Sequence, residues 1–415
     1  MSRYGMLAGC TLVLAIAGVP AIAGATKGPT LAEGKKLVSA VTPKTLSSHV
    51  NLGLAWLAKH QLENGAWGQG DESQEMGVGA ELSRKPIIGD TCAAALAFIR
   101  AGHTPAKGEY KEVVRRAVVY ICSQVEKSPP NTLAITNVTG TRLQAKLGPN
   151  IDTFLASLLL AEVKGQMGNP KDEKRVAAEF HRIADKIEMN QKKDGTLDKE
   201  GWAPALSQVI AAKALNRGAQ NGLKVSEKSR QLAETYGRKQ FDSKGGGFGA
   251  GGSAGVDLYA SAGSLGAMQQ SDNTNSVLEL EYRNNLKTAK NEPAKRQAQA
   301  QLDRIAANRK DLEGARKAVV KKMDDPAFVA GFGSNGGEEF LSHMNIGESL
   351  VVKGGPEWKK WDEQMTKNMD RIQNPDGSWS GHHCITGRTF CTAAALMVLT
   401  VDRSPVPLAQ KISRK

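Results

Sequence analysis

The sequence contains few aromatic residues and lacks several motifs that identify common enzymes. Only 5% of its 415 residues are Phe, Trp or Tyr. It contains no Gly-rich phosphate-binding loop followed by Lys and Ser or Thr, and no His-Glu-x-x-His pair of zinc ligands. After the first 25 residues, no apolar run is long enough to span a bilayer. These absences exclude a P-loop nucleotide hydrolase, a zincin-type protease and a membrane-spanning bundle.

The first 25 residues have the pattern of a secretory signal peptide. Arg3 precedes an apolar stretch at 6–17, and small residues at 21–25 provide a cleavage site. The mature protein is therefore expected to be exported, to the periplasm or the medium. The expected segments are a signal peptide at 1–25, an N-terminal segment at 26–46, a helical domain at 47–402 with a basic helical insertion at 276–325, and a C-terminal tail at 403–415.

Four cysteines remain once the signal peptide is removed: Cys92, Cys122, Cys384 and Cys391. An even number in an oxidising compartment is compatible with two disulfides. Cysteine also packs as a small apolar side chain inside helices. The sequence alone is compatible both with disulfides and with buried free thiols.

The positive charge is concentrated in one segment. The chain has a formal net charge of +13, and residues 282–322 contain twelve Lys or Arg against four Asp or Glu. Such a composition is typical of a solvent-exposed helix. The alternative is a surface that binds an acidic polymer or a membrane. The sequence contains no specific nucleic-acid-binding motif. Pro293 is expected to divide the insertion into two helical pieces.

A loop of constant spacing recurs along the chain. It occupies residues 61–67, 191–197 and 373–379, each time with Gln first, Asn or Asp fourth, Gly fifth and Trp or Leu seventh. A looser copy lies at 240–249. Asn-Gly and Asp-Gly turns end a helix because glycine accepts a positive φ. The aromatic residue in the seventh position is expected to pack between neighbouring repeats.

Each loop lies between two kinds of helix. The preceding helix is amphipathic, whereas the following one has alanine and leucine on nearly every face and must be buried all round. The expected inner helices lie near residues 91–101, 153–164, 203–217, 257–268, 338–352 and 389–400. One hairpin cannot bury its inner helix alone, but a ring of about six can. The predicted fold is therefore all-α, an (α/α)6 toroid of helix-hairpin repeats that closes on itself.

Two segments resemble a known family. Residues 56–67, with the pattern Trp-Leu-x-x-x-Gln-x-x-x-Gly-x-Trp, resemble the QW motif of squalene and oxidosqualene cyclases. Residues 388–396 resemble an inner helix of protein prenyltransferase β-subunits. The resemblance to this prenyltransferase and squalene-cyclase repeat family implies the terpenoid cyclase and protein prenyltransferase toroid over most of the mature chain.

The cyclase signature of the family is incomplete in this chain. Squalene-type cyclases protonate their substrate with an Asp-x-Asp-Asp motif, and the nearest string, at 322–325, lacks the first aspartate. Those cyclases also line their cavity with aromatic rings that stabilise carbocations, and this chain has few such rings. Cyclase activity is therefore not expected.

The zinc signature of the prenyltransferases is matched in part. The family binds zinc through Asp-x-Cys and a later histidine, and Asp90 and Cys92 have the Asp-x-Cys spacing. Ring closure would bring His382, His383 and Cys384 near them, which makes zinc a candidate cofactor. The alternative is that Asp90 caps its helix and Cys92 packs in the core.

Acidic residues mark the starts of the expected inner helices. If these helices are parallel, their positive dipole ends surround one mouth of the central cavity. The candidate mouth residues are Asp90, Asp152, Asp257, Glu338, Glu339, His343 and His383. Helix capping explains carboxylates at these positions. The alternative is a pocket that binds a polar ligand, a cation or a sugar.

These observations lead to one expected function and one competing class. The favoured hypothesis is an exported toroid that acts as a binding or scaffold protein, with an unknown ligand in its central cavity. The competitor is an enzyme of the same fold, either a diverged isoprenoid-handling transferase or cyclase, or a polysaccharide hydrolase or lyase. Two carboxylates about 6.5–9.5 Å apart in an open groove would favour inverting glycan hydrolysis. A dry apolar cavity would favour isoprenoids.

Overall fold

The computed structural model describes residues 40–71, 80–197, 199–333 and 335–404. Helices make up 65% of the structure, and this part of the chain contains no β-strand. The predicted signal peptide, residues 26–39 of the N-terminal segment and residues 405–415 of the tail lie outside the described residues. Within the described ranges, no helix combines the length and the apolar character needed to cross a membrane.

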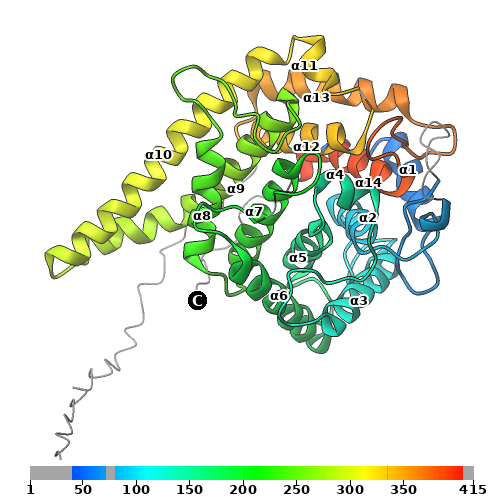
Figure 1. Ribbon diagram of the computed structural model, residues 1–415, viewed down its shortest axis with the longest axis horizontal. Coiled ribbons are helices and arrows are strands. Elements are labelled where there is room, and N and C mark those ends of the chain that lie inside the picture. The colour runs from blue at the N-terminus through cyan, green and yellow to red at the C-terminus, as the bar shows by residue number, and fades with distance from the viewer. Residues whose placement is uncertain (1–39, 72–79, 198, 334, 405–415) are drawn as a thin grey trace, which may run out of the picture. The chain divides into compact units, whose positions relative to one another are not determined.

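The helices form an inner and an outer set (Figure 1). The inner helices are α2 (Ile88–Arg100), α5 (Ile151–Val163), α7 (Pro204–Gln220), α9 (Asp257–Thr288), α12 (Gly337–Val351) and α14 (Arg388–Leu399). The outer helices are α1 (Ser48–Lys59), α3 (Lys111–Lys127), α6 (Pro170–Asn190), α8 (Glu227–Lys239), α10 (Glu292–Lys322) and α13 (Gly355–Ile372). The short helices are η1 (Ala80–Leu82), α4 (Arg142–Leu147), α11 (Pro326–Ala330) and η2 (Val401–Arg403).

The composition of each helix explains its position. Every residue of α5 is buried, as expected for a helix that is apolar on all faces. The outer helix α6 instead buries a stripe that includes Val176, Phe180, Ile183 and Ile187, at spacings of three and four residues. This spacing places the four side chains on one side of the helix, toward the core, and leaves the charged side to solvent.

The inner helices contact one another in a circuit. Helix α2 packs on α5, α5 on α7, α7 on α9, α9 on α12 and α12 on α14, and α14 packs on α2. The first and last repeats therefore lie side by side, as the blue α1 and the red α14 also show (Figure 1).

The three strict copies of the loop have the same geometry. Gly65, Gly195 and Gly377 all have positive φ values, between 87° and 90°. In each copy the residue after this glycine donates its backbone N–H to the Asn or Asp side chain before it, at 3.0–3.1 Å. The repeat predicted from spacing is thus one repeated backbone structure, and the positive φ accounts for glycine at its fifth position.

The loop glutamines connect each repeat to another outer helix. The amide of Gln61 donates to Val113 O of α3 at 2.9 Å, and that of Gln191 donates to Ser229 O of α8 at 3.2 Å. In the last copy, the amide of Gln373 donates to His49 O of α1 at 2.9 Å. The same side chain that joins consecutive hairpins therefore also joins the last hairpin to the first.

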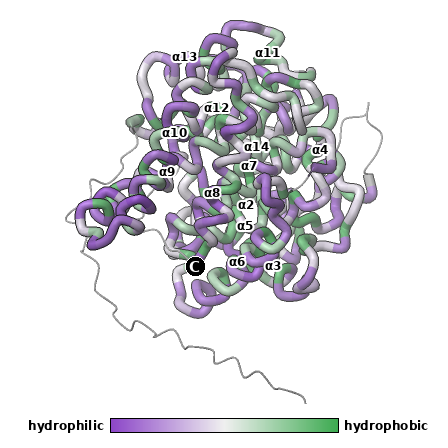
Figure 2. The backbone as a smooth tube through the Cα atoms, turned by 60° about the vertical axis from the view of Figure 1, so that its left-hand side comes forward, coloured by the Kyte–Doolittle hydropathy of each residue, from purple (hydrophilic) through white to green (hydrophobic). Residues whose placement is uncertain are grey.

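The basic insertion has a different structure from the expected one. We expected a short inner helix at 257–268 followed by a separate insertion at 276–325, but α9 continues without a break from Asp257 to Thr288. The expected division into two helical pieces near Pro293 is present, since α9 ends at Thr288 and α10 begins at Glu292. Pro293 occupies the first turn of α10, where proline is tolerated because that N–H needs no helical partner. The two long helices form a hairpin that extends from the other helices (Figure 1). Hydrophilic residues predominate along its outer part (Figure 2).

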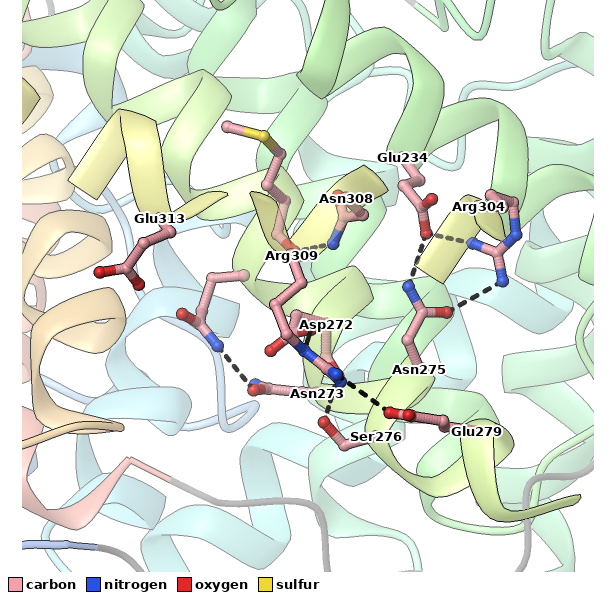
Figure 3. A network of polar contacts seen from close by, with 12 residues as sticks. Glu234, Asp272, Asn273, Asn275, Ser276, Glu279, Arg304, Asn308, Arg309 and Glu313 are labelled. Carbon is pink, nitrogen blue, oxygen red and sulfur yellow. Dashed lines mark hydrogen bonds and ion pairs between the residues drawn. The ribbon is translucent and has the colours of Figure 1, made fainter. Parts of the chain in front are cut away.

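Polar contacts hold the two helices of this hairpin together (Figure 3). The guanidinium of Arg304 contacts Glu234 of α8 and donates to Asn275 of α9 at 3.1 Å. Arg309 pairs with Asp272 at 3.3 Å and with Glu279 at 3.0 Å. Part of the basic charge of 282–322 is therefore neutralised within the protein, and its use for an acidic polymer or a membrane stays a prediction.

Candidate functional site

A cavity of about 430 Å³ lies between the inner helices. Its volume is in the range of small-molecule sites, roughly 300–1,000 Å³. Five of the inner helices, α2, α5, α7, α12 and α14, supply its apolar wall. The apolar side chains are Leu96, Ile99, Leu155, Leu158, Ile210, Leu341, Met344, Phe390 and Met397.

The end of the cavity near the C-terminal ends of the inner helices is strongly basic. One acidic side chain lines the cavity there, that of Glu162. The five basic ones are Arg100, Lys164, Lys213, Arg217 and Arg403. The cavity is therefore amphipathic, with an apolar body and a positively charged end.

Two buried carboxylates hold three of the five basic side chains in place. Glu348 of α12 binds Arg100 Nη2 at 2.7 Å and Lys213 Nζ at 2.5 Å. Glu162 of α5 binds Arg217 through two contacts, at 2.8 and 3.1 Å. Burial alone would raise the pKa of Glu348, but the charges and hydrogen bonds of Lys213 and Arg100 outweigh burial and lower it to about 2.

The helix dipoles explain why basic residues are tolerated here. The starts of the inner helices lie together, since Gly89 N of α2 donates to Asp152 of α5 and Tyr259 of α9 donates to Glu339 of α12. Helices α2 and α5 therefore run in the same direction, as do α9 and α12. Arg100 and Arg217 lie in the last turns of α2 and α7, where the negative dipole end of a helix favours a cation. Acidic residues occupy the opposite, positive ends for the same reason.

These charged residues were absent from the site predicted from the sequence. Lys213 lies in the run Ala-Ala-Lys-Ala-Leu, and Glu162 follows Leu-Leu-Leu-Ala. A single charged residue in a helix that is apolar on all faces must be buried and paired. That signal was available, whereas the pairing itself depends on helices distant in sequence.

The predicted mouth residues lie elsewhere. Among the described residues that line the cavity, none belongs to the predicted set of Asp90, Asp152, Asp257, Glu338, Glu339, His343 and His383. Asp90 and Asp152 are buried within the first turns of α2 and α5, so neither is the N-cap residue that the sequence suggested. Asp152 accepts hydrogen bonds from Gly89 N at 2.7 Å and Gln144 Nε2 at 2.8 Å, which is a structural role.

Asp257 and His343 are separated from the other candidates. Asp257 is half-exposed at the start of α9 and pairs with Lys322 at 2.6 Å. His343 lines a different groove, of about 650 Å³, between α11, α12 and α13. Its ring nitrogen lies 3.2 Å from Val329 O, and burial lowers its pKa to about 4. This histidine is therefore neutral at physiological pH.

The structure does bring Glu338, Glu339 and His383 together, at the start of α12. Glu339 is fully buried and accepts hydrogen bonds from Tyr259 and from Phe332 N. His383 Nε2 lies 3.7 Å from Glu339 Oε2. Burial and the neighbouring Glu339 raise the pKa of Glu338 to about 8, so this carboxyl holds its proton at neutral pH.

This protonated carboxyl predicts a pH dependence of stability. The pKa of Glu338 rises from an ordinary 4.5 to about 8 on folding. The contribution of this carboxyl to the free energy of unfolding is complete below pH 4.5. It is lost as the pH rises toward 8, by about 1.4 kcal/mol per pH unit. Glu338→Gln should remove most of this loss in urea unfolding measured at acidic, neutral and alkaline pH. The exposed variant Glu63→Gln is the control, and equal pH profiles for Glu338→Gln and wild type would contradict the assignment.

The structure gives no support to zinc as a candidate cofactor. Among the described residues, no three His, Cys, Asp or Glu side chains come close enough to hold a metal ion. This applies to the predicted set of Asp90, Cys92, His382, His383 and Cys384. Burial also raises the pKa of the Cys92 thiol well above its ordinary value, which disfavours the thiolate that zinc requires. The four cysteines, Cys92, Cys122, Cys384 and Cys391, are buried free thiols.

One further pattern has the spacing of a serine-hydrolase nucleophile. Residues 251–255 read Gly-Gly-Ser-Ala-Gly. Ser253 is fully buried, and its hydroxyl donates to Ala250 O at 2.9 Å. In serine hydrolases this turn follows a strand and exposes the hydroxyl, whereas here it belongs to the loop before α9. Ser253 is therefore a structural residue of that loop.

Searches of protein-family models and of curated protein sequences find no match to this chain.

Proposed function

We propose that this chain is an exported binding protein that holds an apolar small molecule in the cavity between its inner helices. The observation that carries this proposal is the cavity of about 430 Å³, whose apolar wall comes from five different helices. Burying apolar ligand surface against such a wall contributes about 25 cal/mol per Å². Export rests on the signal-like residues 1–25.

The same proposal includes the ring architecture. The circuit of inner-helix contacts and the Gln373–His49 hydrogen bond support a closed (α/α)6 toroid of the prenyltransferase and squalene-cyclase repeat type. In such a ring the cavity is a consequence of the fold, because inner side chains of limited length leave space on the axis. Repeat spacing and the two resembling motifs supply the link to that family.

The geometry favours binding over glycan hydrolysis. Glu338 and Glu339 are adjacent carboxylates among the predicted mouth residues, and both are fully buried. A polysaccharide needs an open groove with accessible carboxylates. Phe390 is the aromatic residue of the described cavity wall, whereas carbocation chemistry needs several aromatic faces. An apolar ligand that is held without reaction fits these residues best.

Filling the cavity tests the proposal directly. The wild-type protein is expected to bind the neutral fluorescent probe Nile red with increased emission. In Leu158→Trp, the larger ring occupies the space of the ligand, and the dissociation constant should rise about tenfold or more, equivalent to about 1.4 kcal/mol. Leu52→Trp is the matched control, because Leu52 is 53% exposed on α1. Absence of probe binding by the wild type, or equal binding by both variants, would refute a ligand site between the inner helices.

A further inference from the structure

The basic end of the cavity carries more positive charge than its own carboxylates neutralise. Five basic side chains line the cavity, and three carboxylates pair with four of them: Glu162 with Arg217, Glu348 with Arg100 and Lys213, and Glu173 with Lys164 at 3.4 Å. Charged groups at the end of an apolar cavity are desolvated, so they favour a ligand that brings the opposite charge. The cavity, with its apolar wall and basic end, therefore suits an amphiphilic ligand.

Among these cations, Lys213 and Arg100 both retain hydrogen-bond donors that a ligand can use. Arg217 makes three contacts, to Glu162 and Gln220, and Arg100 makes two, to Glu348 and Ser404, of the five N–H groups that each guanidinium carries. The ammonium of Lys213 has three N–H groups. It binds Glu348 at 2.5 Å and has a long contact of 3.5 Å to Asn345 Oδ1.

From this geometry we propose that the ligand is a single-chain amphiphile with an anionic head group, which Lys213 binds while the chain lies against the apolar wall. The proposal rests on the proposed binding function and adds the chemical class of the ligand. Lys213 is 6% exposed, so its bond to an anion is shielded from water. Such charge-assisted hydrogen bonds are roughly twice as strong as neutral ones. The rim residue Arg403 adds charge near the same end.

The test uses three ligands with the same chain and different head groups. Dodecanoate, dodecyl phosphate and dodecanol compete with Nile red for the wild-type protein at neutral pH. At least one anion is expected to displace the probe at a concentration about tenfold below that of dodecanol, the effect of one charge-assisted hydrogen bond. The tighter of the two anions identifies the head group as a carboxylate or a phosphate.

A lysine variant then locates the head group. Lys213→Met replaces the ammonium-bearing side chain by an unbranched, uncharged one that is one atom shorter, and it leaves Glu348 paired with Arg100, so no carboxylate loses its last cation. We expect it to keep Nile red binding and to lose more than half of the preference for the anion over dodecanol. Lys192→Met, an exposed lysine in a loop, makes the same change in net charge and should leave the preference unchanged.

The outcomes separate this inference from the proposed function. If Nile red binds and dodecanol competes as well as both anions, the head-group inference is wrong and the apolar binding function stands. If Nile red does not bind the wild type, the binding function itself is wrong. If the anion preference survives in Lys213→Met, the head group does not lie at Lys213 and the proposal fails as stated.

Discussion

Replacing Trp379 with alanine is expected to lower the free energy of unfolding by about 3–5 kcal/mol, the cost of removing a buried aromatic side chain. Trp379 is fully buried between α13 and α14. Its indole N–H donates to Met369 O at 2.9 Å, and its backbone N–H donates to Thr392 Oγ1 at 3.0 Å. The variant loses this packing and leaves a carbonyl of α13 without its donor.

Trp67 should show a loss of the same size, because it has the same environment in the first repeat. Its indole N–H donates to Leu57 O at 2.8 Å, and its backbone N–H donates to Thr91 Oγ1 at 2.9 Å. In both repeats the accepting carbonyl lies ten residues before the tryptophan. The agreement of two sites at opposite ends of the chain makes the loop a repeated structural anchor.

Urea unfolding followed by circular dichroism measures both effects. Trp202→Ala is the matched control, because Trp202 is 39% exposed and packs against Phe332 on the surface. Its cost should stay below about 1 kcal/mol, as for surface positions generally. If Trp67→Ala and Trp379→Ala cost no more than the control, the tryptophans are not anchors of the repeats.

Neutralising Glu348 is expected to have an effect of similar size. Glu348→Gln leaves Arg100 and Lys213 buried without a counter-charge, and removing one partner of a buried ion pair costs about 3–5 kcal/mol. Glu112→Gln provides the comparison, because Glu112 forms an exposed pair with Arg115 at 2.6 Å. That variant should cost about 1 kcal/mol or less.

The pH dependence of stability provides a second test of the role of Glu348. Folding lowers the pKa of Glu348 from 4.5 to about 2, so its stabilisation is present above pH 4.5 and is lost as the pH falls toward 2. The loss amounts to about 3 kcal/mol. Glu348→Gln should lack this acid-dependent loss, and an unchanged acid profile in the variant would mean that the cluster is not held by an ionised Glu348.

The local parts of the structure could be predicted from the sequence. The spacing of apolar residues in α6 and the continuous apolar face of α5 predict an outer and an inner helix, since each pattern repeats within a few residues. The glycine turns were equally local, because an Asn-Gly or Asp-Gly pair favours a tight turn with a positive φ at the glycine. The length of α9 was not predicted, because its second half is stabilised by Arg304 and Arg309 of α10.

The charged end of the cavity was decided by the tertiary structure. Arg100 and Lys213 meet at Glu348, although more than one hundred residues separate each of them from it. No local pattern encodes a contact at that distance, and the acidic helix starts instead suggested a site at the opposite end. The sequence by itself determined that the chain forms repeated helical hairpins with a buried inner helix. Only the packing of the inner helices decided which charged side chains are removed from water and brought together. The physical reason is that the electrostatic field at each charge is the sum of contributions from all neighbouring helices.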